Sequence, residues 1–174
     1  MNYFRTISIG LPFFNASATL LDSLRSIFAQ SYQDWELILV DDGSTDNSFE
    51  IVRSIRDARV CVYSDRTNCG LPFRLNQIAQ LAQGFYLARM DADDMMHPER
   101  LARQYKYLVE NPKIDLVDSA VYSLDEHGIP AGVRGQTELD LSPRSIIRKG
   151  LLIHPTIMGR RDWFRRNPYD PQFP

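Results

Sequence analysis

The segment ISIGLPFFNASATLLDSLRSIFAQSYQDWELILV, residues 7–40, determines how the rest of the chain is interpreted. It opens with a short strand-like run at 7–11 and closes with a nearly continuous apolar run, WELILV, at 35–40. Between these runs, apolar side chains recur at helical spacing at Leu20, Leu24 and Ile27. Near-continuous apolar strands are typical of parallel sheets that are covered on both faces. The segment therefore predicts a β-α-β unit.

The same alternation continues toward the C-terminus. We expect a helix over 46–55, a strand over 59–63, a helix from residue 75 that ends in a left-handed cap at Gly84, and a strand over 85–90. A second set of elements follows: an amphipathic helix after Pro98, one strand over 114–122, a turn at 125–128 and a short helix at 143–149, with no packed element in 165–174. The pattern predicts an α/β fold, a mostly parallel, Rossmann-like sheet flanked by helices, with ligands at the carboxyl ends of the strands.

Composition limits the classes of protein that this chain can belong to. It has 174 residues, 44% hydrophobic and 24% charged, without a linker or internal repeat, so we expect residues 1–174 to form a single domain. No apolar run approaches the roughly 20 residues that cross a bilayer, and the N-terminus lacks a signal-peptide pattern, so we expect a cytoplasmic protein. A net charge of −2 argues against nucleic acid as a partner.

Two acidic clusters follow predicted strands. In DDGSTD, residues 41–46, Gly43 permits a tight turn, and a side chain among residues 44–46 can cap the next helix. Capping explains Asp41 and Asp42 less well, because both directly follow a buried strand. A carboxylate there can accept a hydrogen bond from the imide of a uracil or the amino group of a guanine.

The second cluster, DADD at residues 91–94, follows the strand predicted at 85–90. Asp91 and Asp93 alternate along an extended segment, and hard cations such as Mg²⁺ or Mn²⁺ bind carboxylate oxygens together with substrate phosphates. A bound cation would also remove the repulsion between these carboxylates. The alternative is that Asp93 or Asp94 caps the helix that begins near Pro98.

Three ordered segments together resemble the family 2 inverting glycosyltransferases, which have the GT-A fold. They are SIGLPFFNASATLLDSLRSIFAQSYQDWELILVDDGSTDNS, then NCGLPFRLNQIAQLAQGFYLARMDADDMMHPERLARQ, and HPTIMGRR. The resemblance implies a nucleotide-sugar site made of Pro12, Asn15, Asp42, Arg74, Asp91 and Asp93. In it, Asp42 and Arg74 hold the base, while Asp91 and Asp93 carry Mn²⁺ or Mg²⁺, with Asp93 the expected direct ligand.

The resemblance also implies the reaction and its partners. A nucleotide-diphospho-sugar would donate its sugar to a saccharide or lipid-linked acceptor with inversion. UDP is the favoured nucleotide because it is usual in the family. The family's general base is an aspartate in an ED-type motif after a segment like GYDPxFPxAED, whereas this sequence stops at YDPQFP. We therefore expect the general base beyond residue 174 and assign no catalytic residue within the chain.

Other segments and other protein classes give weaker indications than this resemblance. His154 resembles a position near the acceptor, or it is a core or capping histidine. The arginines of GRRDWFRRNP, residues 159–168, could contact lipid phosphate at the membrane surface, or they could cover an aromatic side chain on a solvated helix face. The sequence lacks the motif that a phosphatase, a nicotinamide dehydrogenase or a sugar nucleotidyltransferase would each require. The remaining alternative is a module that binds a nucleotide sugar without turnover.

Overall fold

The computed structural model describes residues 5–125, 127–135 and 152–172. Its first half alternates strands and helices: β1 (Ile7–Phe13), α1 (Leu20–Phe28), β2 (Trp35–Asp41), α2 (Ser48–Arg53), β3 (Val60–Ser64), α3 (Leu71–Leu81) and β4 (Tyr86–Arg89). The second half contains α4 (Arg100–Glu110), β5 (Leu116–Val117), β6 (Val121–Leu124), β7 (Pro130–Arg134), the 3₁₀-helix η1 (His154–Thr156), β8 (Met158–Arg160) and α6 (Arg161–Arg166). The predicted α/β architecture is confirmed.

The main sheet has the strand order β3-β2-β1-β4-β8-β5. β1 pairs in parallel with β2 on one side and with β4 on the other, and β3 extends the parallel set beyond β2. β8 is antiparallel to both of its neighbours. The carboxyl ends of β1, β2 and β4 therefore meet at one edge of the sheet.

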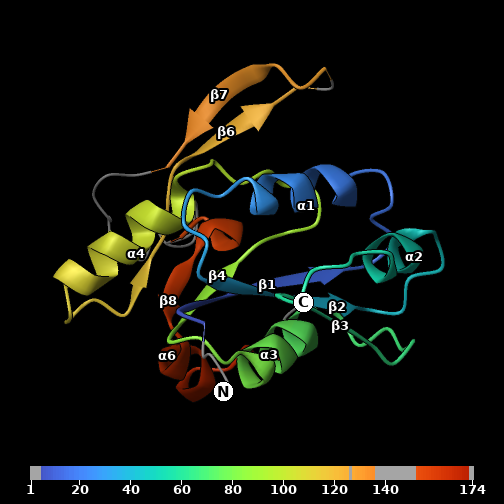
Figure 1. Ribbon diagram of the computed structural model, residues 1–174, viewed down its shortest axis with the longest axis horizontal. Coiled ribbons are helices and arrows are strands. Elements are labelled where there is room, and N and C mark those ends of the chain that lie inside the picture. Colours follow the sequence, from blue (N-terminus) through green and yellow to red (C-terminus); the bar gives the residue numbers. More distant parts are fainter. Residues whose placement is uncertain (1–4, 126, 136–151, 173–174) are drawn as a thin grey trace.

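Helices cover both faces of this sheet (Figure 1). Alternate residues of β2 face opposite sides: Leu37 and Leu39 pack with α1, α2 and α4, while Ile38 and Val40 pack with α3 and α6. This burial on both faces explains why WELILV reads as an unbroken apolar run. Among the described residues, no helix combines the length and the apolar character needed to cross a membrane.

Two glycines allow close packing against β1. A Cβ on Gly10 would lie 2.3 Å from Cγ2 of Ile78, so only glycine lets α3 approach the sheet this closely. A Cβ on Gly84 would lie 2.7 Å from the backbone nitrogen of Ser8. The prediction of a left-handed cap at Gly84 was wrong, because Gly84 is not among the glycines with positive φ and α3 ends earlier, at Leu81. The close approach of Gly84 to β1, rather than its φ angle, requires a glycine there.

The strand predicted over 114–122 is two short strands in different sheets. β5 pairs with β8 in the main sheet, whereas β6 pairs with β7 in a separate hairpin. Figure 1 shows this hairpin projecting away from the main sheet. The turn expected at 125–128 is confirmed in its described residues, where Gly128 has φ 75° and its N–H donates to the Asp125 carbonyl.

The C-terminal part is more ordered than expected. The region from 165 onward was predicted to lack packed structure, yet α6 ends at Arg166 and Tyr169 is tied to α3. Asn76 of α3 forms two 2.8 Å hydrogen bonds with the Tyr169 backbone, donating to its carbonyl and accepting from its N–H. The helix predicted at 143–149 lies outside the described residues.

Candidate active site

Pro12 and Asn15 are placed by the end of β1. Pro12 is buried within the strand and pairs with Val40 of β2, which fixes the position of the residues that follow. Asn15 has φ 47°, a left-handed conformation that asparagine tolerates better than most residues. Its side-chain oxygen accepts hydrogen bonds from the N–H groups of Thr45 (2.8 Å) and Asp46 (3.3 Å). Asn15 therefore fastens the end of β1 to the loop after β2.

The first acidic cluster builds this loop. Gly43 has φ 79° and makes the tight turn. Asp41 accepts a hydrogen bond from the Ser44 N–H (2.9 Å), while Asp46 accepts one from the N–H of Ser48 at the start of α2 (2.9 Å). The hydrogen bond from the Ser48 side chain is the main reason that the pKa of Asp46 is lowered. Turn formation therefore accounts for Asp41 and Gly43, and Asp46 satisfies the first N–H of α2, whose N-cap position is Asn47.

Asp42 is instead joined to the predicted base-binding arginine. Its Oδ1 accepts from Nε of Arg74 (2.8 Å) and from the N–H of Cys69 (2.8 Å), and its Oδ2 accepts from the N–H of Gly70 (3.0 Å). A carboxylate has about four acceptor positions, so one remains for a ligand. The sequence placed Asp42 and Arg74 at one site, and the structure brings them into direct contact.

Arg74 is almost completely buried, with 1% of its side chain exposed. Besides Asp42, its guanidinium donates to both carboxylate oxygens of Asp65, at 2.7 and 3.0 Å. Hydrogen bonds to Asp65 and then to Asp42 raise the pKa of Arg74, and the hydrogen bond from Arg74 in turn lowers the pKa of Asp65 to about 2. Asp65 was not predicted, and its only sequence signal is its place directly after β3.

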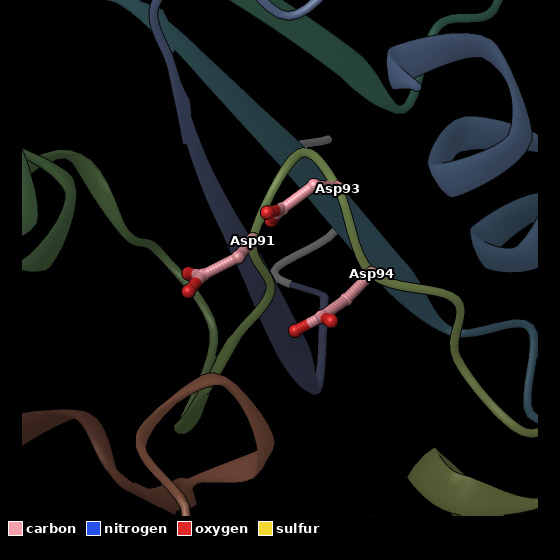
Figure 2. Close-up of side chains that lie close together, drawn as sticks. All are labelled: Asp91, Asp93 and Asp94. Atoms are coloured by element: carbon pink, nitrogen blue, oxygen red, sulfur yellow. The ribbon is translucent and has the colours of Figure 1, made fainter. Parts of the chain in front are cut away.

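The second acidic cluster forms a compact group on the loop after β4. Oxygen atoms of Asp91, Asp93 and Asp94 all lie within 4.8 Å of one another. Figure 2 shows the three carboxylates turned to the same side of the loop. The alternative that one of them caps the next helix is wrong, because α4 begins at Arg100 with Glu99 as its N-cap residue.

A third carboxylate, Asp94, lies beside Asp91 and Asp93, the two residues that were predicted to bind the cation. Burial raises the pKa of Asp94, and the neighbouring charges of Asp91 and Asp93 raise it further. The charges of Arg100 and Arg89 offset only part of this effect, so the pKa of Asp94 stays raised. Asp94 can contribute an oxygen ligand to a cation held by Asp91 and Asp93. In the sequence, only its position next to Asp93 indicates this role.

Two buried arginines lie beside this acidic cluster. Arg89 donates from Nε to Oδ1 of Asp91 (2.9 Å) and from Nη2 to Oδ2 (3.2 Å). Arg100 donates to the Arg89 carbonyl (2.9 Å), and burial lowers its pKa to about 10, an effect that Asp94 and Asp91 oppose. Neither arginine was predicted as a site residue, although Arg89 lies only two positions before Asp91.

His154 lies next to Arg89, with its Nδ1 in contact with the guanidinium. Its ring also packs edge-on against Tyr169, with centroids 5.2 Å apart. The structure thus joins His154 to the acidic cluster through Arg89. Its predicted place near the acceptor stays a prediction.

The family model for glycosyl transferase family 2 matches residues 8–170. The chain belongs to this family. Its resemblance to the family 2 glycosyltransferases, first drawn from three motifs, is therefore confirmed over almost the whole sequence.

Curated relatives agree with this family assignment. EpsE of Bacillus subtilis strain 168, which is named as a glycosyltransferase, is 35% identical over 170 residues, covering 95% of this chain and 60% of EpsE. An uncharacterized glycosyltransferase of Haemophilus influenzae is 40% identical over 107 residues, covering 60% of this chain and 43% of that protein. The chain thus spans about half the length of the curated relatives that it matches.

Solved structures confirm the GT-A type of fold. Residues 1–349 of Staphylococcus aureus TarS match with a TM-score of 0.76 at 23% identity, covering 95% of this chain and 50% of TarS 1–349. The mannosyltransferase PcManGT of Pyrobaculum calidifontis matches with a TM-score of 0.72 at 18% identity, covering 98% of this chain and 49% of that protein.

The arginines of residues 159–168 serve this family 2 fold in a way that neither sequence-based alternative anticipated. Arg165 donates to the carbonyls of Ala79 (3.0 Å) and Ala82 (3.0 Å) at the end of α3. Arg160 donates to the Leu108 carbonyl (3.1 Å) near the end of α4. Cations near helix C-termini satisfy unpaired carbonyls. Membrane contact through these arginines, and a cytoplasmic location, stay predictions.

Proposed function

We propose that this chain binds a nucleotide-diphospho-sugar, preferably a UDP-sugar, and that the protein transfers the sugar with inversion to a saccharide or lipid-linked acceptor. The observation that carries the proposal is the arrangement at one sheet edge of the Asp42–Arg74 pair and the three-carboxylate group of Asp91, Asp93 and Asp94. We also propose that residues 1–174 act as one nucleotide-sugar-binding domain.

Solved relatives of similar fold support the choice of donor. TarS 1–349 has been crystallised with UDP and with UDP-GlcNAc, and PcManGT with GDP-Man and Mn²⁺. These ligands share a nucleoside diphosphate, for which the two clusters provide complementary chemistry. Asp42 and Arg74 offer an acceptor and a donor for a base, and the carboxylates offer ligands for a cation that contacts the diphosphate.

The donor set of the acidic group fits Mn²⁺ or Mg²⁺. Three carboxylates can direct oxygen atoms to one point, and oxygen is the ligand that these cations prefer. The pKa of Asp94 is raised first by burial and then by the charges of Asp91 and Asp93, and a cation would relieve this repulsion. Asp93 and Asp91 would hold the ion, with Asp94 beside them. When bound, the ion would stabilise the negative charge that develops on the departing nucleoside diphosphate.

The protein's own residues would provide orientation for the transfer. Asp42 and Asp65 hold the Arg74 side chain of α3 in place, so it needs little rearrangement when a nucleotide binds. Asn15 joins the end of β1 to the loop after β2, which also carries Asp42. The acceptor hydroxyl must lose a proton as it attacks, and we assign this general-base role to no residue of 1–174.

Calorimetry with UDP, GDP and dTDP, each with and without Mn²⁺, tests the proposal. We expect Mn²⁺-dependent binding that is strongest for UDP and is lost in Asp93→Ala. Asp22→Ala is the matched control, because Asp22 is an exposed carboxylate whose side chain pairs with Arg25 on α1. Equal nucleotide binding with and without Mn²⁺ in the wild type would contradict the metal assignment.

Release of UDP from UDP-sugars in the presence of candidate acceptors separates transfer from binding alone. Acceptor-dependent release that is lost in Asp93→Ala would support the transferase. Tight Mn²⁺-dependent binding without acceptor-dependent release would favour the alternative, a nucleotide-sugar-binding module.

A further inference from the structure

Arg89 is the residue through which the acidic group is connected to the C-terminal part of the chain. Only 5% of its side chain is exposed, and its guanidinium donates hydrogen bonds to both carboxylate oxygens of Asp91. Its backbone N–H donates to the Ile157 carbonyl at 2.8 Å, next to β8. A two-point contact of this kind fixes the direction of a carboxylate as well as its position. The orientation of Asp91 therefore depends on where Arg89 is held.

His154 contacts the same guanidinium on its other side. The contact joins Nη1 of Arg89 to Nδ1 of the ring. A guanidinium has only donors and stays protonated in proteins, so Nδ1 must be the acceptor. A neutral imidazole with a lone pair on Nδ1 carries its proton on Nε2. Donation from Arg89 to Nδ1 therefore requires the Nε2–H tautomer of His154.

The His154 ring is itself held by elements distant in sequence. It belongs to η1, and it packs against Tyr169 with an interplanar angle of 72°. Tyr169 is tied to α3 by its two backbone hydrogen bonds with Asn76. Burial raises the pKa of the Tyr169 phenol, and a hydrogen bond with Arg89 opposes this effect. Tyr169 therefore supports the His154 ring from a position that is itself beside Arg89.

We propose that His154 is a positioning residue that, as the Nε2–H tautomer, holds Arg89 against Asp91 and so sets the geometry of the acidic group. It is not the proton acceptor of the reaction. Its Nδ1 lone pair is occupied by Arg89 and its Nε2 carries a proton, so neither nitrogen can accept a proton from a hydroxyl. This inference rests on the proposed function only in that Asp91 is taken to help bind the cation.

The tautomer can be tested without metal or substrate. Long-range ¹H–¹⁵N correlation spectra at pH 7.5 distinguish the two neutral tautomers and the imidazolium, and loss of a signal in His154→Asn identifies the residue among the three histidines of the chain. We expect a neutral ring protonated on Nε2. A ring protonated on Nδ1, or a doubly protonated ring, would overturn the proposal.

Two substitutions test the positioning role. In His154→Asn, the side-chain oxygen can lie near the former Nδ1 and accept from Arg89, but it cannot act as a base. His154→Leu removes the acceptor. Loss of an outer partner of a metal ligand typically weakens metal binding by about 10- to 100-fold. We expect Mn²⁺-dependent UDP binding to fall about tenfold in His154→Leu and to stay within about threefold of wild type in His154→Asn.

The remaining outcomes are also decisive. Equal binding by both variants and the wild type, or equal loss in both, would show that His154 does not position the acidic group. Thermal unfolding in EDTA shows whether His154→Leu is folded, and His154→Asn decides the question if it is not.

If UDP release depends on a base at His154, His154→Asn should lose about 10²- to 10⁴-fold in rate, which would overturn the proposal. Absence of Mn²⁺-dependent binding in the wild type would reject the proposed function, while the spectra would still decide the tautomer.

Discussion

Asp42 and Arg74 form a buried ion pair, with Oδ1 and Nε 2.8 Å apart and with 9% and 1% of their side chains exposed. The two residues come from the loop after β2 and from α3. Because Asp42 also accepts the N–H groups of Cys69 and Gly70, one carboxylate holds the whole loop that leads into α3. The pair is therefore structural as well as a candidate contact for the base.

Asp42→Ala should lower both stability and nucleotide affinity. Breaking a buried ion pair on one side typically costs about 3 to 5 kcal/mol, and we expect the lower end, about 3 kcal/mol, because Arg74 keeps Asp65 as a partner. Urea unfolding measures the stability change, and calorimetry at a temperature where the variant is folded measures UDP affinity. A variant with wild-type stability and weakened affinity would restrict Asp42 to ligand contact.

Gly10→Ala should destabilise the fold through a steric clash between β1 and α3. The added Cβ would lie 2.3 Å from Cγ2 of Ile78, and overpacking of a core typically costs about 1 to 3 kcal/mol. Ile78→Ala removes the obstructing methyl group. In urea unfolding, the double variant should therefore lose less stability than the sum of the two single variants. Simple additivity would show that α3 moves away from the sheet instead.

The parallel half of the fold could be predicted because its strands are buried on both faces. β1 and β2 are apolar runs separated by a segment with helical periodicity. The other strands that pair with them, β3 and β4, come next along the chain. β8 was not predicted, since three residues are too few for a period and its pairing with β4 and β5 joins distant segments.

The site was predictable where its residues follow strands, and less so where contacts depend on tertiary structure. The acidic residues after β2 and β4 are visible in the sequence because carboxyl ends of parallel strands meet at one edge. The contact of Arg89 with His154 joins residues 65 positions apart, so no local pattern signals it. Asp65 lies only nine positions before Arg74, but their contact depends on the irregular segment between β3 and α3, which has no period to predict it.

Asp65 should contribute to stability in a narrow acidic range. Its pKa is held at about 2, mainly by the hydrogen bond from Arg74, against 3.8 as the ordinary value. A carboxylate with a lowered folded-state pKa favours the fold when it is ionised, and this contribution is lost as pH falls from about 4 to about 2. Asp65→Asn should therefore show a smaller fall in urea midpoint between pH 5 and pH 2 than the wild type. Asp57, whose pKa is also lowered to about 2, should preserve part of the fall in both proteins.

Asp94→Asn should make the metal-free protein more stable and the metal-bound protein less so. Without a cation, burial and the charges of Asp91 and Asp93 raise the pKa of Asp94 above 3.8. The folded state therefore binds the Asp94 proton more tightly than the unfolded state, and stability falls as pH rises from 3.8 through the raised pKa.

At pH 7.5 the wild type carries this full penalty, and asparagine removes it while keeping the shape of the side chain. In EDTA we expect the Tm of Asp94→Asn to rise by about 1 to 2 °C, because water screens the charge of this exposed residue. Added Mn²⁺ and UDP should raise the Tm of the wild type more than that of the variant, because the stabilisation by a ligand grows with the logarithm of its concentration relative to its Kd, and the variant binds more weakly. Asp22→Asn, in an exposed pair with Arg25, should show neither effect. A lower Tm of Asp94→Asn in EDTA would mean that Asp94 supports the loop structurally, and that its charge is already neutralised by the protein.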